Sequence, residues 1–317
     1  KDFIIIGLTG RTGCGCTTVA NLLCKEFAEL QPPRAISNDT NAEREYKIIC
    51  EYSKNTWTPF RLIEMKHVIF TFILEYSFRD TSDFINSVAG KAIDISKIKD
   101  KFQALHEKRL EFKERINCLT KAGENVPGDD ELYNYYFNEI PMYYNEFQSS
   151  LSLPIYTKLL QKIGDNIRAS GQAFSEEIAP ENILNISQRV NMLIKILRRR
   201  NLKEKKRVLV VIDAFRNPYE ATFFKDRYSA FYLFSVNTTD IERRQRLVQK
   251  GLTYDDILEL DEREYPSRNN TINDFFQIDI EKTIELADVH ISNLDSESKS
   301  YANPKRQIIR YVSLIMH

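Results

Sequence analysis

The sequence has little glycine, and the glycine that it has is unevenly placed. Only 10 of its 317 residues are glycine, where an average chain of this length has about twice as many. Four of the ten lie within the first fifteen residues: Gly7, Gly10, Gly13 and Gly15. Because glycine is used where the backbone bends sharply or approaches a ligand closely, the N-terminal segment is the first candidate for a binding site.

The sequence also lacks an excess of charge, a long apolar run and a regular cysteine spacing. Lys and Arg number 45, as do Asp and Glu, which argues against binding nucleic acid or anionic lipid through the charge of the whole molecule. No run of 18 apolar residues occurs, so we expect no membrane span. Five cysteines without an export signal indicate a reducing compartment. We therefore expect a cytoplasmic protein.

Patterns for metal binding by cysteine and histidine, and for nucleophilic catalysis, are absent as well. The four histidines lie far apart in the sequence, and Cys14 and Cys16 have no second cysteine pair downstream. No G-x-S-x-G or paired Cys/His pattern occurs. The sequence therefore predicts no zinc site in this chain.

Short apolar runs near both ends of the chain predict buried strands. They cover residues 2–8, 207–213, 230–236 and 287–291, and helix-like segments separate them. Strands that alternate with helices indicate an α/β domain with a mainly parallel sheet. We expect the sheet of a P-loop NTPase, similar to a nucleotide kinase, with a large helical insertion.

The predicted insertion spans residues 81–204, so that the α/β domain is formed by residues 1–80 and 205–317. Apolar residues recur at heptad spacing from 95 to 119, with Arg109 at the one position that breaks the pattern, and residues 131–150 are rich in Tyr and Phe. The heptad fits either a helical hairpin packed inside the chain, which we favour, or a coiled-coil partner face. On account of the heptad and of the aromatic-rich residues 131–150 we expect a homo-oligomer. The heptad positions are Ile95, Ile98, Phe102, Leu105, Phe112, Ile116 and Leu119.

Residues 10–17, called here the glycine loop, match the phosphate-binding pattern G-x-x-x-x-G-K-[ST] except that Cys16 replaces the lysine. A predicted strand precedes the loop and an amphipathic helix follows it, as the motif requires. Backbone N–H groups in such a loop bind phosphate without help from the lysine. The alternative is a glycine turn that only connects strand to helix. We expect a nucleoside triphosphate, ATP or a deoxynucleotide, to be held by Gly10, Arg11, Thr12, Gly13, Cys14, Gly15, Cys16, Thr17 and Thr18.

Loss of the lysine removes the cation that offsets charge on the β- and γ-phosphates during transfer. Nucleotide binding with weak or absent catalysis is therefore the expected outcome, and Arg11 is the nearest residue that could replace the charge. The hydroxyl of Thr17 is expected to hold Mg²⁺.

Three further positions complete the predicted site. Asp213 ends an apolar strand, where a carboxylate supports Mg²⁺ or acts as a catalytic base; its alternative role is to cap the next turn. Arg216 follows closely and could contact phosphate, with Pro218 placed to begin a helix. Arg243 and Arg244 offer further guanidinium groups, unless they only form a solvated helix face. The basic run at 195–207 is expected to be a solvated helix end.

Three segments give the chain a resemblance to a known family. Residues 6–18, 212–218 and 287–293 resemble the N-terminal region of bacterial anti-phage dCTP/dCMP deaminases, and the last two segments also resemble parts of nucleoside monophosphate and dephospho-CoA kinases. In the deaminases a kinase-like P-loop region precedes a zinc-dependent deaminase domain. The resemblance implies a protein that depletes deoxycytidine nucleotides during phage infection, in which this segment binds nucleotide and holds the assembly together.

The zinc motifs of the deaminase, H-x-E and P-C-x-x-C, are missing here, so the deaminase domain and its zinc are expected beyond residue 317. The start at Lys1 and the apolar end at 314–317 also fit a segment of a longer protein. Two other functions stay open: an active deoxynucleoside monophosphate kinase, or a non-enzymatic scaffold that assembles through the heptad. The sequence does not reveal whether an RNA or a phage factor acts as regulator.

Overall fold

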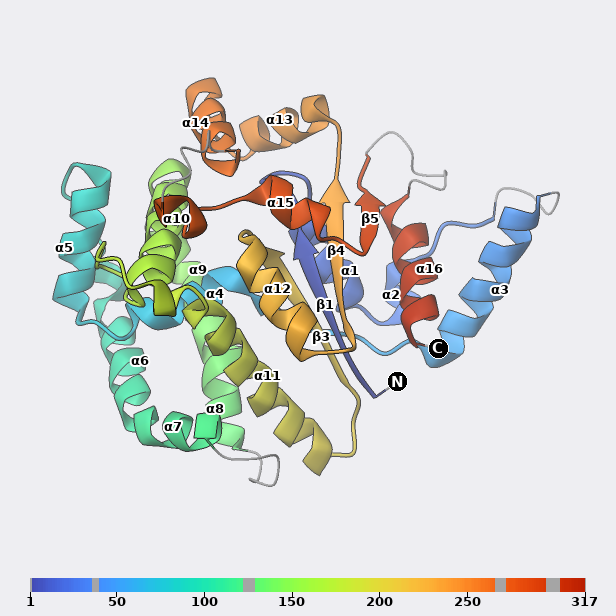
Figure 1. Cartoon of the computed structure of the whole chain (residues 1–317), viewed down its shortest axis with the longest axis horizontal. Helices are drawn as coiled ribbons and strands as arrows, with labels where there is room; N and C mark the ends of the chain where they lie inside the picture. The colour runs from blue at the N-terminus through green and yellow to red at the C-terminus, as the bar shows by residue number, and fades with distance from the viewer. Residues whose placement is uncertain (1, 36–39, 122–128, 266–271, 295–302, 317) are drawn as a thin grey trace. The chain divides into compact units, whose positions relative to one another are not determined.

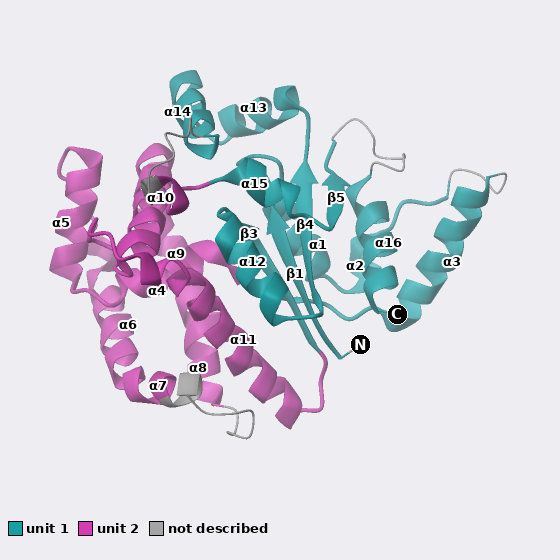
Figure 2. Cartoon of the chain, viewed as in Figure 1, with its two compact units in different colours: residues 1–62, 208–266, 279–317 teal, residues 63–207, 267–278 magenta. Residues whose placement is uncertain are grey.

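The chain divides into two units, each with its own core (Figure 2). Unit 1 comprises residues 1–62, 208–266 and 279–317, and unit 2 comprises residues 63–207 and 267–278. The sequence placed the corresponding boundaries at 80/81 and 204/205. The computed structural model describes residues 2–35, 40–121, 129–265, 272–294 and 303–316, without the side chains of 118–121, 272 and 273.

Five parallel strands form the sheet, in the order β2-β3-β1-β4-β5 (Figure 1). Four of them were predicted: β1 (Phe3–Thr9), β3 (Val208–Phe215), β4 (Phe231–Asn237) and β5 (Val289–Ser292). The fifth, β2 (Arg61–Glu64), was not predicted. Ile5 of β1 pairs with a residue of β3 on one side and of β4 on the other. The segment that leads into the glycine loop is thus the central strand.

The sequence of β1 explains its central position. Ile4, Ile5 and Ile6 are all 0% exposed, and β-branched residues favour strands that are buried on both faces. Gly7 leaves room for aromatic rings, because a Cβ there would lie 2.5 Å from the ring of Phe215 and 2.8 Å from that of Phe231. The β1 sequence therefore sets how closely its neighbours approach.

Helices surround the sheet in unit 1. The helix predicted after the glycine loop, α1, ends at Leu23, and Phe27 begins a separate short helix, α2. Pro218 is the first residue of α12, as predicted, and the side chain of Asn217 caps its N-terminus. The helices are α1 (Cys16–Leu23), α2 (Phe27–Leu30), α3 (Asn41–Thr56), α12 (Pro218–Arg227), α13 (Asp240–Gln249), α14 (Tyr254–Glu264), α15 (Ile280–Glu285) and α16 (Pro304–Met316).

The described part of unit 2 consists of helices and the segments that connect them, apart from the end of β2. One element, η2 (Tyr135–Glu139), is a π-helix. The α-helices are α4 (Met65–Ile73), α5 (Phe78–Ala89), α6 (Lys99–Glu111), α7 (Lys113–Lys121), α8 (Asp130–Asn134), α9 (Ile140–Ser149), α10 (Leu153–Ser170) and α11 (Asn185–Lys203). The short 3₁₀ helices are η1 (Ser96–Ile98), η3 (Pro180–Asn182) and η4 (Ile272–Phe275).

The heptad residues lie inside the core of unit 2. Ile98 is 4% exposed, Phe102 0% and Phe112 3%, and Phe102 packs edge-on against the ring of Phe70. Leu119 lies outside the residues whose side chains are described. The described heptad positions form an internal packing face, in agreement with the favoured interpretation of a helical hairpin packed inside the chain. These positions therefore give no reason to expect a partner protein.

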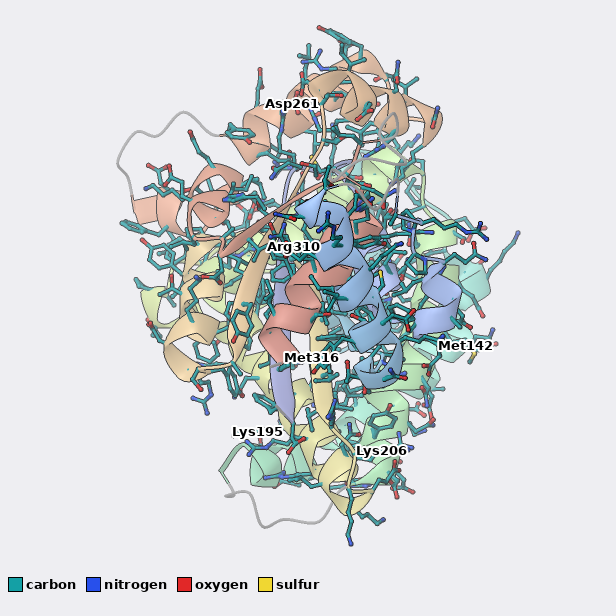
Figure 3. All side chains as sticks on the ribbon, turned by 90° about the vertical axis from the view of Figure 1, so that its right-hand side faces the viewer. Met142, Lys195, Lys206, Asp261, Arg310 and Met316 are labelled. Atoms are coloured by element: carbon teal, nitrogen blue, oxygen red, sulfur yellow. The ribbon has the colours of Figure 1, made fainter. Side chains whose placement is uncertain are left out.

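The basic run at 195–207 forms the end of α11 and the segment after it; Figure 3 labels Lys195 and Lys206. Arg200 and Lys203 pair with Asp130, and Lys206 pairs with Glu204. From Leu202 to Arg207 the run is exposed, as predicted for a solvated helix end, but Arg199 within α11 is buried, at 7% exposure. Among the described residues, no helix is both long and apolar enough to span a membrane.

Candidate functional site

The glycine loop leaves the carboxyl end of β1 and enters α1, at the edge of a parallel sheet where ligands generally bind. Gly10, Gly13 and Gly15 all have positive φ, of 154°, 93° and 100°. A Cβ on Gly10 would lie 2.4 Å from the carbonyl oxygen of Val236. A Cβ on Gly15 would lie 2.0 Å from the Nδ2 of Asn293. The glycines are therefore required by backbone conformation and by close packing together.

The N-terminus of α1 is open to an acceptor from outside the helix. Gly15 occupies the N-cap position, and no side chain caps the first N–H groups of the helix, which have no intrahelical acceptor. Two other N–H groups of the loop are already engaged: Thr12 donates to Oε1 of Glu264 at 2.8 Å, and Cys14 donates to the carbonyl of Arg11 at 3.0 Å. Thr18 follows in the first turn with its side chain exposed. The end of the loop whose donors stay open is thus its helical end, a kind of position that favours anions.

Thr17, in the first turn of α1, meets Asp213 on β3. The Thr17 hydroxyl donates to Oδ2 of Asp213 at 2.7 Å, although the two residues are 196 positions apart in the sequence. Thr17 is exposed and Asp213 is half-buried, so both oxygens are accessible at the sheet edge. A hydroxyl and a carboxylate are ligands that suit Mg²⁺ when phosphate and water supply the rest. In the described part of the chain no three His, Cys, Asp or Glu side chains cluster to enclose a metal by themselves.

Cys16 faces the interior rather than the solvent. It is 7% exposed and belongs to the core cluster that contains Ile4 and Val19. Burial, reinforced by the carboxylate of Asp213, raises the pKa of the Cys16 thiol far above its ordinary value. The residue in the lysine position is therefore a neutral thiol that supplies no charge to the loop.

The arginines that the sequence assigned to phosphate are held by carboxylates of α13 and α14. Arg11 donates to Asp240 at 2.9 Å and to Asp261 at 2.7 Å. Arg243, 1% exposed, donates to Asp261 at 2.6 Å and to the carbonyl of Thr12 at 3.2 Å. Arg244 donates to Asp240 at 3.1 Å. Although partial burial opposes it, these three guanidinium groups lower the pKa of Asp240.

Glu264, which the sequence did not single out, is the buried centre of this network. It is 0% exposed, and its Oε1 accepts hydrogen bonds from Thr12 Oγ1 at 2.5 Å and from Arg216 at 2.8 Å, besides the Thr12 N–H. Arg216, the fourth predicted phosphate ligand, also donates to Thr12 Oγ1 at 3.0 Å. A carboxylate thus already occupies one anion-binding corner of the loop.

Asn293, directly after β5, supports the loop from the other side. Its amide donates to the carbonyl of Cys14 at 2.8 Å, and its own backbone carbonyl accepts from Arg246 at 2.8 Å. Asn293 is 9% exposed. No local motif marks Glu264, and Asn293 ends the 287–293 segment without having been assigned to the loop, because each meets the loop only through the fold.

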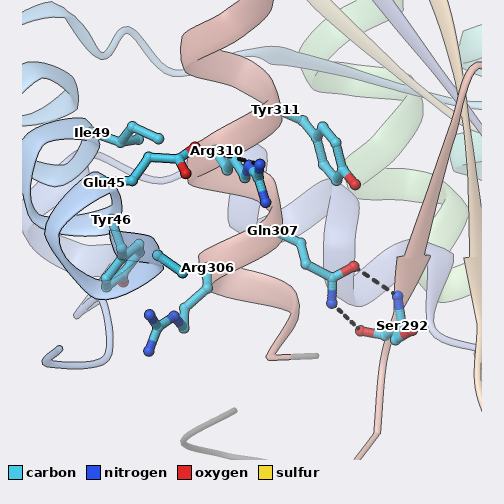
Figure 4. A pocket seen from close by; sticks show the side chains of 9 residues that line it. Glu45, Tyr46, Ile49, Ser292, Arg306, Gln307, Arg310 and Tyr311 are labelled. Atoms are coloured by element: carbon cyan, nitrogen blue, oxygen red, sulfur yellow. Dashed lines mark hydrogen bonds and ion pairs between the residues drawn. The ribbon is translucent and has the colours of Figure 1, made fainter. Parts of the chain in front are cut away.

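A separate pocket of about 290 Å³ lies in unit 1 between α3 and α16 (Figure 4). Arg306 stacks over the ring of Tyr46 at 3.9 Å and pairs with Glu43, while Gln307 bonds the backbone N–H and carbonyl of Ser292. None of the predicted site residues lines it. Arg306, Gln307 and Arg310 are engaged by Glu43, Ser292 and Glu45, so the pocket assigns no ligand.

Comparison with known proteins adds no family assignment: no protein-family model, curated protein or solved structure matches the chain.

Proposed function

We propose that unit 1 binds a nucleoside triphosphate with Mg²⁺ at the glycine loop. The observation that supports this most directly is the hydrogen bond between Thr17 and Asp213, since it brings the hydroxyl of the loop motif to a carboxylate on the adjacent strand. Both lie beside the uncapped N-terminus of α1. Phosphate oxygens would accept from the backbone N–H groups, and the two side chains would hold the cation.

We further propose that binding serves regulation more than turnover. A lysine in the position of Cys16 would carry charge to the transferring phosphate, and groups of this kind contribute about two to three orders of magnitude in rate. The buried Cys16 thiol is neutral, and Arg11, which could replace the charge, is engaged by Asp240 and Asp261.

The wider role follows from the resemblance of residues 6–18, 212–218 and 287–293. We propose a cytoplasmic anti-phage deoxycytidylate deaminase, with this chain as its nucleotide-binding and assembly region and with zinc confined to a deaminase domain beyond residue 317. Homo-oligomer formation stays part of this proposal through the resemblance alone, because the described heptad residues are buried inside unit 2. An active deoxynucleoside monophosphate kinase is the second candidate, because the kinase-like segments and the Thr17–Asp213 pair would serve it equally well.

Titration calorimetry with a panel of ribo- and deoxynucleotides, with and without Mg²⁺, tests the binding proposal. We expect at least one triphosphate to bind, more tightly with Mg²⁺, and no panel member binding to folded protein would refute it. Assays of phosphate release and of transfer to deoxynucleoside monophosphates separate the two candidates. Rapid transfer would establish the kinase.

A further inference from the structure

A pair of arginines converges inside the helical unit, far from the glycine loop in the sequence. Arg109 comes from α6 and Arg189 from α11, and both donate to the same oxygen, Oε1 of Glu75, at 2.8 and 2.7 Å. Glu75 follows the end of α4. Arg189 also donates to Thr71 at 2.9 Å and lies over the ring of Phe72 at 4.0 Å. Three helical segments thus fix two guanidinium groups around one carboxylate.

The charges in this cluster do not balance. Two cations share one anion, although Arg109 is only 9% exposed and burying unneutralised charge is costly. The other ion pairs of this part of the fold do not relieve the excess: Glu139, another carboxylate that acts electrostatically on Tyr135, is bonded to Lys108 and Asn134. The cluster therefore retains about one uncompensated positive charge.

Hydrogen-bonding capacity in the cluster is also left unused. The Nε of Arg109 and the hydroxyl of Tyr136 are buried and have no hydrogen-bond partner within the described part of the protein. Tyr136 is 4% exposed. Burial raises the pKa of its hydroxyl, while Arg109 and Arg189 oppose the shift, so the hydroxyl lies within electrostatic range of both cations. Buried polar groups without partners are rare and call for an explanation.

The backbone at Tyr136 is unusual too. Tyr136 belongs to the π-helix η2, and single π-turns occur frequently at functional sites. The side chain of Glu75 is 37% exposed, so the cluster reaches the surface at the carboxylate that the two arginines share.

We propose that Arg109, Arg189 and Tyr136 form a binding site for a phosphomonoester dianion, which takes the place of the Glu75 carboxylate between the two guanidinium groups. Arginine forks match phosphate oxygens, and the Tyr136 hydroxyl supplies a further donor. The site lies wholly within unit 2 and does not depend on nucleotide binding by the glycine loop. Inorganic phosphate and the phosphate of a nucleoside monophosphate are the two sources of this chemistry.

The test measures the thermal stability of the whole chain as a function of phosphate concentration, at constant ionic strength held with chloride. A ligand that binds only the folded protein raises the melting temperature in proportion to its affinity. Tyr136→Phe removes only the partnerless hydroxyl, so without phosphate it should be at least as stable as the parent. With phosphate its stabilisation should be reduced, corresponding to an affinity about tenfold lower, as expected for a bond to a charged group.

Two further variants should change the phosphate-induced rise in melting temperature in opposite directions. Glu75→Gln removes the competing carboxylate and should enlarge the rise in melting temperature caused by phosphate. Arg109→Gln should abolish the stabilisation by this site, which is the part of the phosphate effect that Tyr136→Phe only reduces. Arg115→Gln, a more exposed arginine of the same unit that pairs with Asp129 and Glu131, is the control and should respond as the parent does. A second series with dCMP in place of phosphate identifies the source. Equal stabilisation of the parent and Tyr136→Phe, or no stabilisation of the parent by either ligand, would overturn the proposal.

Discussion

The glycine loop of unit 1 and the arginine pair of unit 2 offer an anion different kinds of hydrogen-bond donor. Around the loop, Arg11, Arg216, Arg243 and Arg244 share the carboxylates of Asp240, Asp261 and Glu264 on α13 and α14, and the donors left for a ligand belong to the backbone at the start of α1. In unit 2 the donors are side chains, and Glu75 is shared by both arginines.

This difference indicates what each region is sensitive to. A backbone site depends on conformation and close packing, so an added methyl group damages it, whereas a side-chain site depends on charge and is altered by isosteric substitutions. Substitutions in one region should leave the other region unchanged, and each prediction below uses that independence as its reference.

The largest effect is expected from Gly15→Ala. Strain at positive φ costs on the order of 1–3 kcal/mol, and the new Cβ would also collide with Asn293. We expect triphosphate affinity to fall about a hundredfold, since displacements of about 1 Å have effects of this size. Gly251→Ala is the matched control, because Gly251 has a φ of +93° but nothing within 4 Å of an added Cβ. Calorimetry and thermal melts of both variants measure the two effects. Similar triphosphate affinities for the two variants would show that the packing against Asn293 does not affect triphosphate binding.

Cys16→Lys should change affinity in the other direction. A cation in the loop adds a charged hydrogen bond to phosphate, which corresponds to about tenfold tighter triphosphate binding. Because Cys16 is buried in the core, the lysine variant should also melt at a lower temperature without nucleotide. Phosphate release should stay slow, since Arg243 and Arg244 remain bound to Asp261 and Asp240. Cys16→Met, which has a long neutral side chain, separates the charge from the volume change, and equal affinities for the two variants would contradict the account.

A smaller effect is expected from Glu264→Gln. The substitution frees Arg216 from its carboxylate and should strengthen triphosphate binding about threefold, while loss of a charged hydrogen bond lowers the free energy of unfolding by about 1–3 kcal/mol. Glu262→Gln alters an exposed residue of the same helix and should do neither. Urea denaturation and calorimetry check both parts. Weaker triphosphate binding by Glu264→Gln would mean that the carboxylate supports the site rather than competing with the ligand.

Local patterns in the sequence predicted much of the α/β unit. The apolar runs gave β1, β3, β4 and β5, and the expectation that Thr17 and Asp213 act together agrees with their hydrogen bond. The strand β2 was missed because it has four residues with charged ends, Arg61 and Glu64, and only Ile63 is buried. Such a segment lacks the continuous apolar run that marks an interior strand.

Contacts between distant segments account for what was not predicted. Glu264 meets Thr12 across 252 positions, and Asn293 meets Cys14 across 279, so Glu264 has no local signature, and nothing within the 287–293 segment assigns Asn293 to the loop. One signal was available in unit 2: Arg109 interrupts an otherwise apolar heptad. A charged residue in a buried row needs a partner, and here it finds Glu75.

The central claim, that Thr17 and Asp213 hold Mg²⁺ for a triphosphate at the glycine loop, is tested most directly by Mg²⁺-dependent calorimetry on the parent, Thr17→Ser and Thr17→Val. Serine keeps the hydroxyl and valine replaces it with a methyl group of similar size. The account predicts that Mg²⁺ tightens triphosphate binding equally in the parent and Thr17→Ser, and that Thr17→Val loses about tenfold in affinity with Mg²⁺ but little without it. Equal Mg²⁺ dependence in all three proteins, or no triphosphate binding by the folded parent, would contradict it.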